Sequence, residues 1–370
     1  MVPITDYHNE IKTRLETSYI AADQERNMLE EICRCNSNKA PIRFLLSCLY
    51  AKIDNANVDI RKPYTEIEGD NTFSGRHIDE TKIQELITNY KLPVNNTTAY
   101  LTPAFRNIDR PITNDLVLVG RPRNIYTNAV ILINKVYNNT ITPVNLFKEI
   151  FRFLLIIKQE NETRINQLLS SVEKNSDSLP LSSEQIINLL VQHLKCKNSS
   201  RLPVLIIASA YNTISSKFGE KARPLQAHNA ADKQTGSLGD VEITLESDDH
   251  IVTTYEMKDK KVTINDINIA IEKINKSKTQ LDNYLFVTTE AIEEEVIEYA
   301  KSQYDILGVE IAILDCIGFI KHFLHLFHRL RAQFLNNYQS LVLGEPTSSV
   351  GQPLKEAFLV LRKTAESDIA

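Results

Sequence analysis

Glycine is scarce in this sequence, and its scarcity excludes several classes of enzyme. Only 10 of the 370 residues are glycine. None of them forms the Gly-x-x-x-x-Gly-Lys loop that cradles nucleotide phosphates or the Gly-x-Gly-x-x-Gly turn of dinucleotide-binding folds. The Gly-x-Ser-x-Gly elbow of serine hydrolases is also missing. The sequence therefore argues against an ATPase, a kinase, a nicotinamide-dependent dehydrogenase and a serine hydrolase, and we expect no nucleotide cofactor.

Long apolar runs and paired cysteines are lacking as well. No apolar run reaches the ~18 residues needed to span a membrane, and polar residues interrupt the nearest candidates, 151–158 and 311–320. The first nine residues do not combine a basic stretch with an apolar one, so a secretory leader is not expected. The five cysteines are odd in number, and Cys33 and Cys35 are spaced wrongly for a zinc knuckle. We expect free thiols, a cytoplasmic location and no membrane partner.

An excess of positive charge is absent too, because the net charge is −5. This value alone counts against a nucleic-acid partner. However, phosphate contacts depend on local clusters of Lys and Arg more than on the sum over the chain. Such clusters occur, and each is either a phosphate-binding surface or an ordinary solvated face; they comprise Arg106, Arg110, Arg121 and Arg123, and then Lys217, Lys221 and Arg223.

A polar stretch at 174–184 predicts a domain junction. It contains Pro180, and Ser182 or Ser183 is suited to cap a helix that begins near Gln185. Before this stretch, residues 24–35 and 145–172 have helical apolar spacing, and 63–124 is irregular, with a short alternating run at 115–119 that suggests a strand. We predict a mainly helical N-terminal domain over residues 1–178, a mixed α/β domain over 179–342, and a C-terminal tail with a short helix over 343–370.

The second domain has a regular order of predicted elements. Alternation predicts a hairpin of two strands joined by a turn, and later apolar runs predict two more strands between helices. The order indicates a mixed α/β core in which helices cover both faces of a short sheet. The predicted helices are 186–194, 203–218, 264–276, 291–303 and 317 to about 338, and the predicted strands are 241–245, 251–258, 284–288 and 309–314, with the hairpin turn at 247–249.

Three residues of the hairpin point to phosphodiester chemistry. Glu256 and Lys258 are two apart on a strand and therefore project to one face, whereas Tyr255 and Met257 project to the other face, toward the core. Asp240 begins the partner strand. Two carboxylates suit Mg²⁺, which retains several waters and polarises a phosphoryl oxygen, and a lysine can orient water and offset developing charge. A surface ion pair between Glu256 and Lys258 is the alternative interpretation.

The tripeptide Glu-x-Lys is weak evidence by itself. It also occurs at Glu10 and at Glu80, but both positions fall in expected helices without a hairpin. Only Glu256 follows an Asp on a paired strand and precedes helix, strand, helix and strand in order. This context favours Glu256 as the functional residue.

Asp240 with Glu256-Met257-Lys258 resembles the PD-(D/E)xK nuclease superfamily, and Gly239 stands where that superfamily often has Pro. Residues 227–243 and 255–260 are also similar to the SacI-like family of type II restriction endonucleases, as are 72–76 and 101–108, so that the resemblance extends over roughly residues 60 to 320. It implies that residues 179–342 are a PD-(D/E)xK nuclease core. It also implies a Mg²⁺-dependent enzyme that cuts double-stranded DNA at a short sequence, with Asp240 and Glu256 as metal ligands and Lys258 as the catalytic lysine.

Several other residues are candidates for DNA contact or for the metal site. A polar segment before Asp240 could read base edges or could be an ordinary capped loop, and four arginines of the N-terminal domain could contact phosphate or guanine. Glu242 could join the metal site or lie in an ion pair, and Glu220 is a weaker candidate. The spacing of His322, His325 and His328 argues against metal ligation and for core packing or a dimer contact. The DNA-contact candidates are His228, Asn229, Asp232, Gln234 and Thr235 in the polar segment, and Arg76, Arg106, Arg121 and Arg123 in the N-terminal domain.

We therefore expect a site-specific deoxyribonuclease. A structure-specific repair or recombination nuclease and a non-catalytic DNA-binding protein are the alternatives. A palindromic target would favour a homodimer, and the family resemblance implies a companion methyltransferase encoded nearby as a genetic partner.

Overall fold

The computed structural model describes residues 2–95, 102–106, 108–173, 180–225, 237–277 and 281–367. The chain forms two compact units, Met1–Thr163 (unit 1) and Arg164–Ala370 (unit 2), which are described separately. The boundary falls inside helix α7 (Pro143–Glu173), whereas the sequence placed the junction at 174–184. In the described ranges, no helix is both long enough and apolar enough to cross a membrane.

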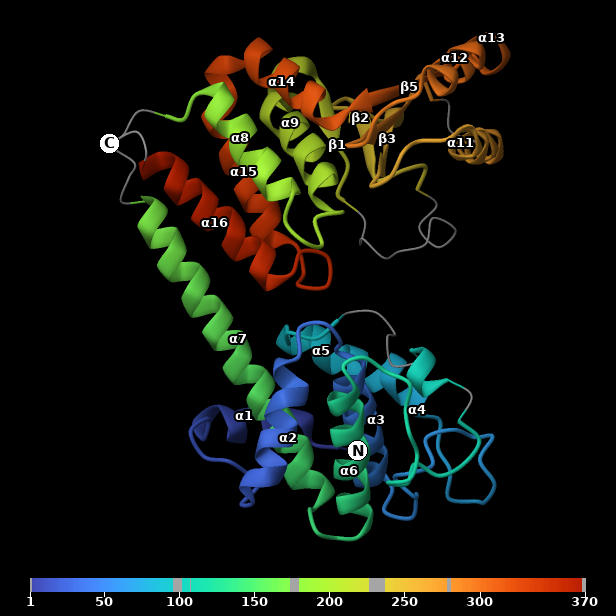
Figure 1. The fold of residues 1–370 in the computed structure, drawn as a ribbon, viewed down its shortest axis with the longest axis vertical. Coiled ribbons are helices and arrows are strands. Elements are labelled where there is room, and N and C mark those ends of the chain that lie inside the picture. The colour runs from blue at the N-terminus through green and yellow to red at the C-terminus, as the bar shows by residue number, and fades with distance from the viewer. Residues whose placement is uncertain are drawn as a thin grey trace. The chain divides into compact units, whose positions relative to one another are not determined.

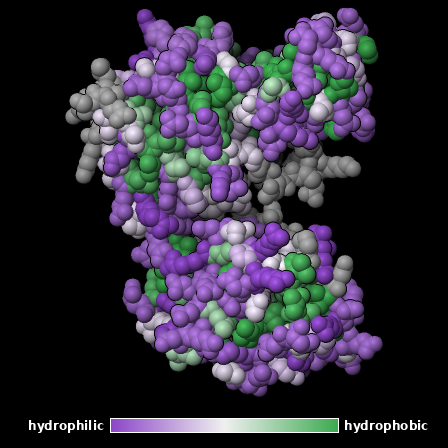
Figure 2. All heavy atoms as spheres, viewed as in Figure 1, coloured by the Kyte–Doolittle hydropathy of each residue, from purple (hydrophilic) through white to green (hydrophobic). Residues whose placement is uncertain are grey.

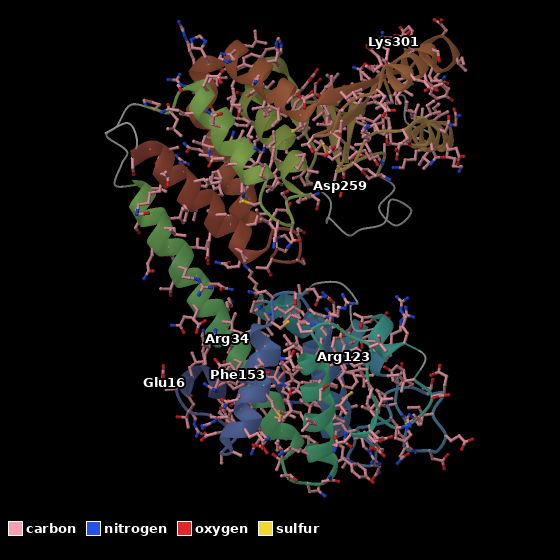
Figure 3. The ribbon with its side chains drawn as sticks, in the orientation of Figure 1. Glu16, Arg34, Arg123, Phe153, Asp259 and Lys301 are labelled. Carbon is pink, nitrogen blue, oxygen red and sulfur yellow. The ribbon has the colours of Figure 1, made fainter. Side chains whose placement is uncertain are left out.

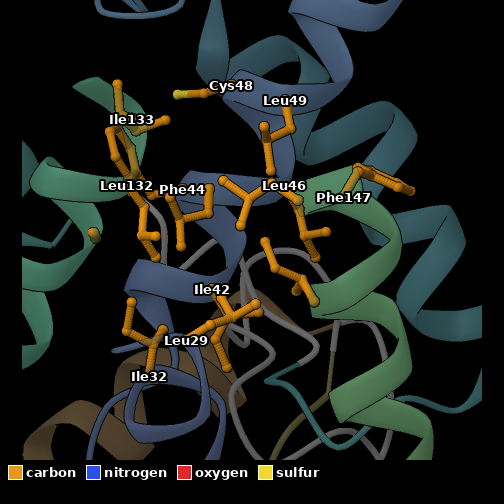
Figure 4. Packing of buried hydrophobic residues seen from close by; sticks show 14 of the residues in the cluster. Leu29, Ile32, Ile42, Phe44, Leu46, Cys48, Leu49, Leu132, Ile133 and Phe147 are labelled. Carbon is orange, nitrogen blue, oxygen red and sulfur yellow. The ribbon is translucent and has the colours of Figure 1, made fainter. Parts of the chain in front are cut away.

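Unit 1 consists of helices packed around an apolar core. In helix α3 (Ala40–Asp54), every residue from Ala40 to Ala51 is buried, and this all-round burial is why helical spacing did not reveal it. In the core, Phe44 of α3 lies beside Leu132 of α6, and Ile42 of α3 lies beside Leu29 of α2 (Figure 4). The other elements of the unit are α1 (Ile4–Thr13), α2 (Asp23–Arg34), α4 (Gly75–Ile78), the π-helix η1 (Asp79–Ile83), α5 (Gln84–Tyr90), the 3-10 helix η3 (Pro103–Phe105) and α6 (Arg123–Tyr137).

The strand expected at 115–119 is wrong. This segment has no regular secondary structure, and the side chains of Val117 and Val119 are 73% and 87% exposed. A strand needs a neighbour to satisfy its backbone groups, and local alternation does not provide one.

Unit 2 contains a five-stranded mixed sheet in the order β1-β2-β3-β4-β5. The hairpin of β2 and β3 is antiparallel, with Val241 opposite Tyr255 and Glu242 opposite Thr254. Strands β3, β4 and β5 run parallel to one another, and Glu256 lies beside Phe286. The strands are β1 (Glu220–Ala222), β2 (Val241–Leu245), β3 (Asp248–Lys258), β4 (Asn283–Thr288) and β5 (Glu310–Asp315).

Helices cover both faces of this sheet, as Figure 1 shows. Val241 and Tyr255 face a core shared with α8, α9, α14, α15 and α16. Tyr284 and Phe286 face a second core, which α11 and α12 complete with Ile267 and Val296. The helices are α8 (Ser183–Leu194), α9 (Leu202–Phe218), α11 (Ile264–Lys276), α12 (Glu294–Ser302), α13 (Tyr304–Leu307), α14 (Cys316–Leu326), the 3-10 helix η4 (His328–Leu330), α15 (Arg331–Gly344) and α16 (Gln352–Ser367). The mixed α/β class is confirmed.

The long helix predicted from 317 to about 338 is wrong. The chain leaves helical geometry at Phe327 (φ −109°, ψ 38°) and continues through η4 into α15. The ring of Phe327 packs on Phe218 and Phe323, and Arg331 donates from Nε to the carbonyl of Leu181. Contacts distant in sequence therefore set the break.

On the face drawn in Figure 2, hydrophilic residues cover most of both units.

Candidate active site

Asp240 is attached to strand β3 on both sides of Glu256. Its backbone N–H donates to the carbonyl of Tyr255 at 2.8 Å, and its Oδ2 accepts from the N–H of Met257, also at 2.8 Å. The carboxylate of Asp240 therefore lies at the edge of β3 next to Glu256. The hairpin brings together two acidic residues that are sixteen positions apart in the sequence.

Glu256 and Lys258 lie on the same face of β3, as expected from strand alternation. Lys258 Nζ is 3.1 Å from Glu256 Oε1, and their side chains are only 20% and 16% exposed. Tyr255 and Met257 point to the opposite face, where they pack with the α8 and α9 core. A freely solvated surface ion pair is thus excluded, because both groups are largely shielded from water.

The second oxygen of Glu256 has two further neighbours that the sequence did not reveal. Lys273 of α11 places its Nζ 3.3 Å from Glu256 Oε2. The hydroxyl of Tyr284, from β4, lies 3.2 Å from the same oxygen and 3.1 Å from the carbonyl of Leu238. Lys273 follows the buried Ala270 by three residues on the inward side of α11, and this helical spacing is the signal that could have identified it.

Asp266 holds Lys258 from a second side. Its Oδ1 is 3.4 Å from Lys258 Nζ, and its Oδ2 accepts from the backbone N–H and the hydroxyl of Thr263 in the capping box of α11. Burial raises the pKa of the Asp266 carboxyl, but the hydrogen bonds of Thr263 and the ammonium of Lys258 outweigh burial and leave this pKa below its usual value. Asp266 therefore remains an anion that fixes the position of the lysine.

Gly239 is required by the close approach of the chain to β3. A Cβ atom at this position would lie 2.5 Å from Thr254 Cγ2 and 2.7 Å from the carbonyl oxygen of Tyr255. Proline, which is frequent here in the superfamily that the hairpin resembles, would meet the same obstacle. This chain has glycine instead of proline at residue 239 because its backbone there packs directly against Thr254 and Tyr255 of β3.

Glu242 organises the backbone on either side of the polar segment. Its Oε1 accepts from Ser237 Oγ and from the N–H of Leu238, each at 2.9 Å, and its Oε2 accepts from Arg223 at 2.9 Å. The side chain is only 8% exposed. Glu242 is thus an ion-paired residue that fixes the position of Ser237 and Leu238, shortly before Asp240 in the chain.

The donor set near Glu256 fits a hard divalent cation. Among the described residues, no group of three or more His, Cys, Asp or Glu side chains could hold a metal. Asp240 and Glu256 are two carboxylates, however, and Mg²⁺ is commonly held by one or two carboxylates together with waters and a phosphate oxygen. Three carboxylates (Asp240, Glu256 and Asp266) and two ammonium groups (Lys258 and Lys273) leave the cluster with a formal charge of −1, which a dication would reverse.

Other predicted residues lie elsewhere. The five candidates between 228 and 235 fall outside the described residues. Glu220 pairs with Leu245 at the far end of β2 and is not brought to Asp240. In α14, His325 pairs with Glu184 at 3.0 Å, while Phe323 and Leu324 are buried.

The four arginines of unit 1 that the sequence singled out for DNA contact are exposed. Arg76 forms an ion pair with Glu80 at 2.7 Å. The segments that carry Arg106 and Arg123 meet at Tyr126, whose ring centroid lies 5.2 Å from that of Phe105. Arg123 begins α6 (Figure 3), and Arg121 precedes it on the same segment. These contacts link the two segments within unit 1.

Comparison with known families gives a match in unit 2. Residues 178–290, about a third of the chain, match the model of the SacI restriction endonuclease C-terminal domain. Comparison with curated protein sequences finds no match. The matched span contains β2, β3, Asp240, Glu256, Lys258 and Lys273. By this match, residues 178–290 of unit 2, which include the candidate site, are similar to the C-terminal domain of a restriction endonuclease.

Proposed function

We propose that this chain is a type II restriction endonuclease that uses Mg²⁺ to hydrolyse phosphodiester bonds of double-stranded DNA at a short specific sequence. One observation carries the proposal. Asp240 is bonded to β3 on either side of Glu256, and Lys258 lies 3.1 Å from Glu256 on the same face. This arrangement gathers two carboxylates and an ammonium group at one end of a hairpin, within the span that matches a restriction endonuclease domain.

Each residue has a distinct role in the proposed reaction. Asp240 and Glu256 would hold Mg²⁺, which when bound lowers the pKa of an attacking water and polarises the phosphoryl oxygen. The oxygen of water attacks phosphorus and gives up a proton to solvent, and one P–O ester bond breaks, so that a phosphate monoester forms and the leaving oxygen takes a proton from solvent. Lys258 would orient this water and offset negative charge that develops on the phosphoryl oxygens, while Asp266 keeps its ammonium in place.

Cleavage of mixed-sequence duplex DNA tests the proposal. Purified protein with Mg²⁺ should yield discrete fragments, and sequencing their ends gives both the target and the cut position. Asp240→Asn and Lys258→Gln should each lower the cleavage rate by about 10²–10³-fold or more, as expected for loss of a group that acts in the transition state, while DNA binding is retained.

Asp259→Asn is the matched control, because Asp259 is exposed and directly follows Lys258 (Figure 3). This variant should cleave at the wild-type rate. Unchanged cleavage by Asp240→Asn would reject the assigned site. Cleavage only at branched or frayed DNA would instead favour a repair or recombination nuclease, and binding without any nicking would favour a DNA-binding protein.

We further propose that the enzyme acts as a homodimer, because a two-fold arrangement places one site on each strand of a palindromic target. A methyltransferase gene beside this one would support the restriction function, since unmodified host DNA would otherwise be cut.

A further inference from the structure

Glu256 is held by an ammonium group on each of its two oxygens. Lys258 Nζ lies 3.1 Å from Oε1, and Lys273 Nζ lies 3.3 Å from Oε2. The two lysines come from different elements, β3 and α11, and both side chains are about four-fifths buried. Neither the sequence pattern nor the family match assigns a role to Lys273.

Two neighbours of Glu256 have a second acceptor within reach. Lys258 is also 3.4 Å from Asp266 Oδ1. The hydroxyl of Tyr284 is 3.1 Å from the carbonyl of Leu238, so its single proton can move to that oxygen when it leaves Glu256. Both groups can therefore turn from Glu256 to another acceptor. A cation that approaches Oε2 must in addition move the ammonium of Lys273, whose Nζ lies 3.3 Å from that oxygen.

We propose that Lys273 is the built-in counter-ion of Glu256, and that a divalent cation must displace it from Oε2 in order to bind. Lys273 is thus a positioning residue that keeps the carboxylate in place before the metal arrives and lowers the metal affinity of the protein without DNA. A phosphate of bound DNA would offer the displaced ammonium a new anionic partner, so that metal binding becomes tighter when substrate is present. This inference rests on the proposed function, because it requires that Glu256 binds metal.

Titration calorimetry with Mg²⁺ alone, in the absence of DNA, tests the proposal. Lys273→Met removes the charge while keeping an unbranched side chain, and it should tighten Mg²⁺ binding by roughly tenfold, since an ammonium and a dication repel each other strongly in a partly shielded site. Lys273→Arg keeps the charge and should bind Mg²⁺ nearly as the wild type does. Lys276→Met is the matched control on α11, because Lys276 is 78% exposed and pairs with Glu272 instead.

The outcomes separate this inference from the proposed function. Tighter Mg²⁺ binding by Lys273→Met alone, with a folded far-ultraviolet circular dichroism spectrum, supports it, because a merely structural loss would weaken binding. Equal or weaker binding by Lys273→Met, when the wild type does bind Mg²⁺, overturns the role of Lys273 and leaves the metal site standing. If the wild type binds no Mg²⁺ either alone or with an uncleavable DNA duplex, the proposed function fails and this inference fails with it.

Discussion

At Gly239 the chain passes so close to β3 that a side chain has no room. The backbone of Tyr255 forms one wall, and its carbonyl also accepts the N–H of Asp240. A methyl group at residue 239 would therefore push the chain away from the same carbonyl that fixes Asp240. The position of the carboxylate depends on the residue before it.

Gly239→Ala should damage both stability and cleavage. We expect the free energy of unfolding of unit 2 to fall by about 1–3 kcal/mol, as for an overpacked interior, and the cleavage rate to fall by about 10²-fold, because a small displacement of a reacting group has effects of that size. Urea unfolding and cleavage assays measure the two effects. Gly344→Ala is the control, since an added methyl group there meets no described atom within 4 Å other than its chain neighbours and its own helix backbone. Wild-type cleavage by Gly239→Ala would contradict the close approach.

Among the elements, those with local signals were predicted well. Helix α11 (Ile264–Lys276) was placed correctly from its apolar spacing, and Ser182 caps α8 in a capping box with Gln185, as its sequence suggested. The two faces of β3 were also assigned correctly from alternation. These features depend on residues within a few positions of one another.

The remaining elements depend on distant contacts. Strand β1 has only three residues, and its pairing with β2 defines it. Lys273 reaches Glu256 only because α11 packs on the face of the sheet to which Glu256 points. For the same reason the sequence singled out the three hairpin residues but did not point to Lys273, Tyr284 and Asp266, which lie beside them from α11 and β4.

Helices α8, α15 and α16 are joined by a buried histidine. His193 Nε2 lies 3.0 Å from the carbonyl of Leu354 and must carry the proton, so that Nδ1 accepts from the hydroxyl of Tyr338 at 2.9 Å. Burial lowers the pKa of His193 from 6.5 to about 4, although the hydrogen bond to Leu354 acts in the opposite direction. The neutral imidazole is therefore part of the packing of these three helices.

Unit 2 should lose stability in mild acid through this residue. Between pH 6.5 and about 4, the unfolded chain binds a proton at His193 that the folded chain does not, so stability is present above pH 6.5 and falls as the pH drops toward 4. The loss at pH 5 is about 2 kcal/mol relative to pH 7. Urea unfolding of wild type and His193→Gln at both pH values measures it. The variant should show a smaller difference between the two pH values, whereas His325→Gln, at an exposed site, should behave as wild type. Equal pH dependence in His193→Gln would refute this role.

At the scale of the whole molecule, the net charge of −5 does not describe the surface that DNA would meet. Part of the negative charge belongs to glutamates and aspartates that form ion pairs or lie in the candidate site. Arginines, in contrast, are exposed on unit 1. Arg121 and Arg123 are two residues apart at the start of α6. Binding to DNA should then be governed by such local groups and should weaken steeply as salt is added.

The double variant Arg121→Gln/Arg123→Gln measures this contribution. Each phosphate contact adds about 0.9 to the slope of log affinity against log salt concentration, so the loss of both arginines should lower that slope by about 1.8 if each contacts one phosphate. Fluorescence anisotropy with duplex DNA, without Mg²⁺ to prevent cleavage, gives the slope from 50 to 200 mM salt. Lys12→Gln, at an exposed residue of α1 in the same unit, is the control for loss of positive charge alone and should leave the slope unchanged.

An equal decrease of the slope in both variants would mean that DNA binding depends on the total charge of the protein. An unchanged slope in the double variant would mean that DNA binds to another surface. If affinity falls by the same factor for every sequence, the two arginines contact the backbone; if only the target is bound more weakly, they read bases.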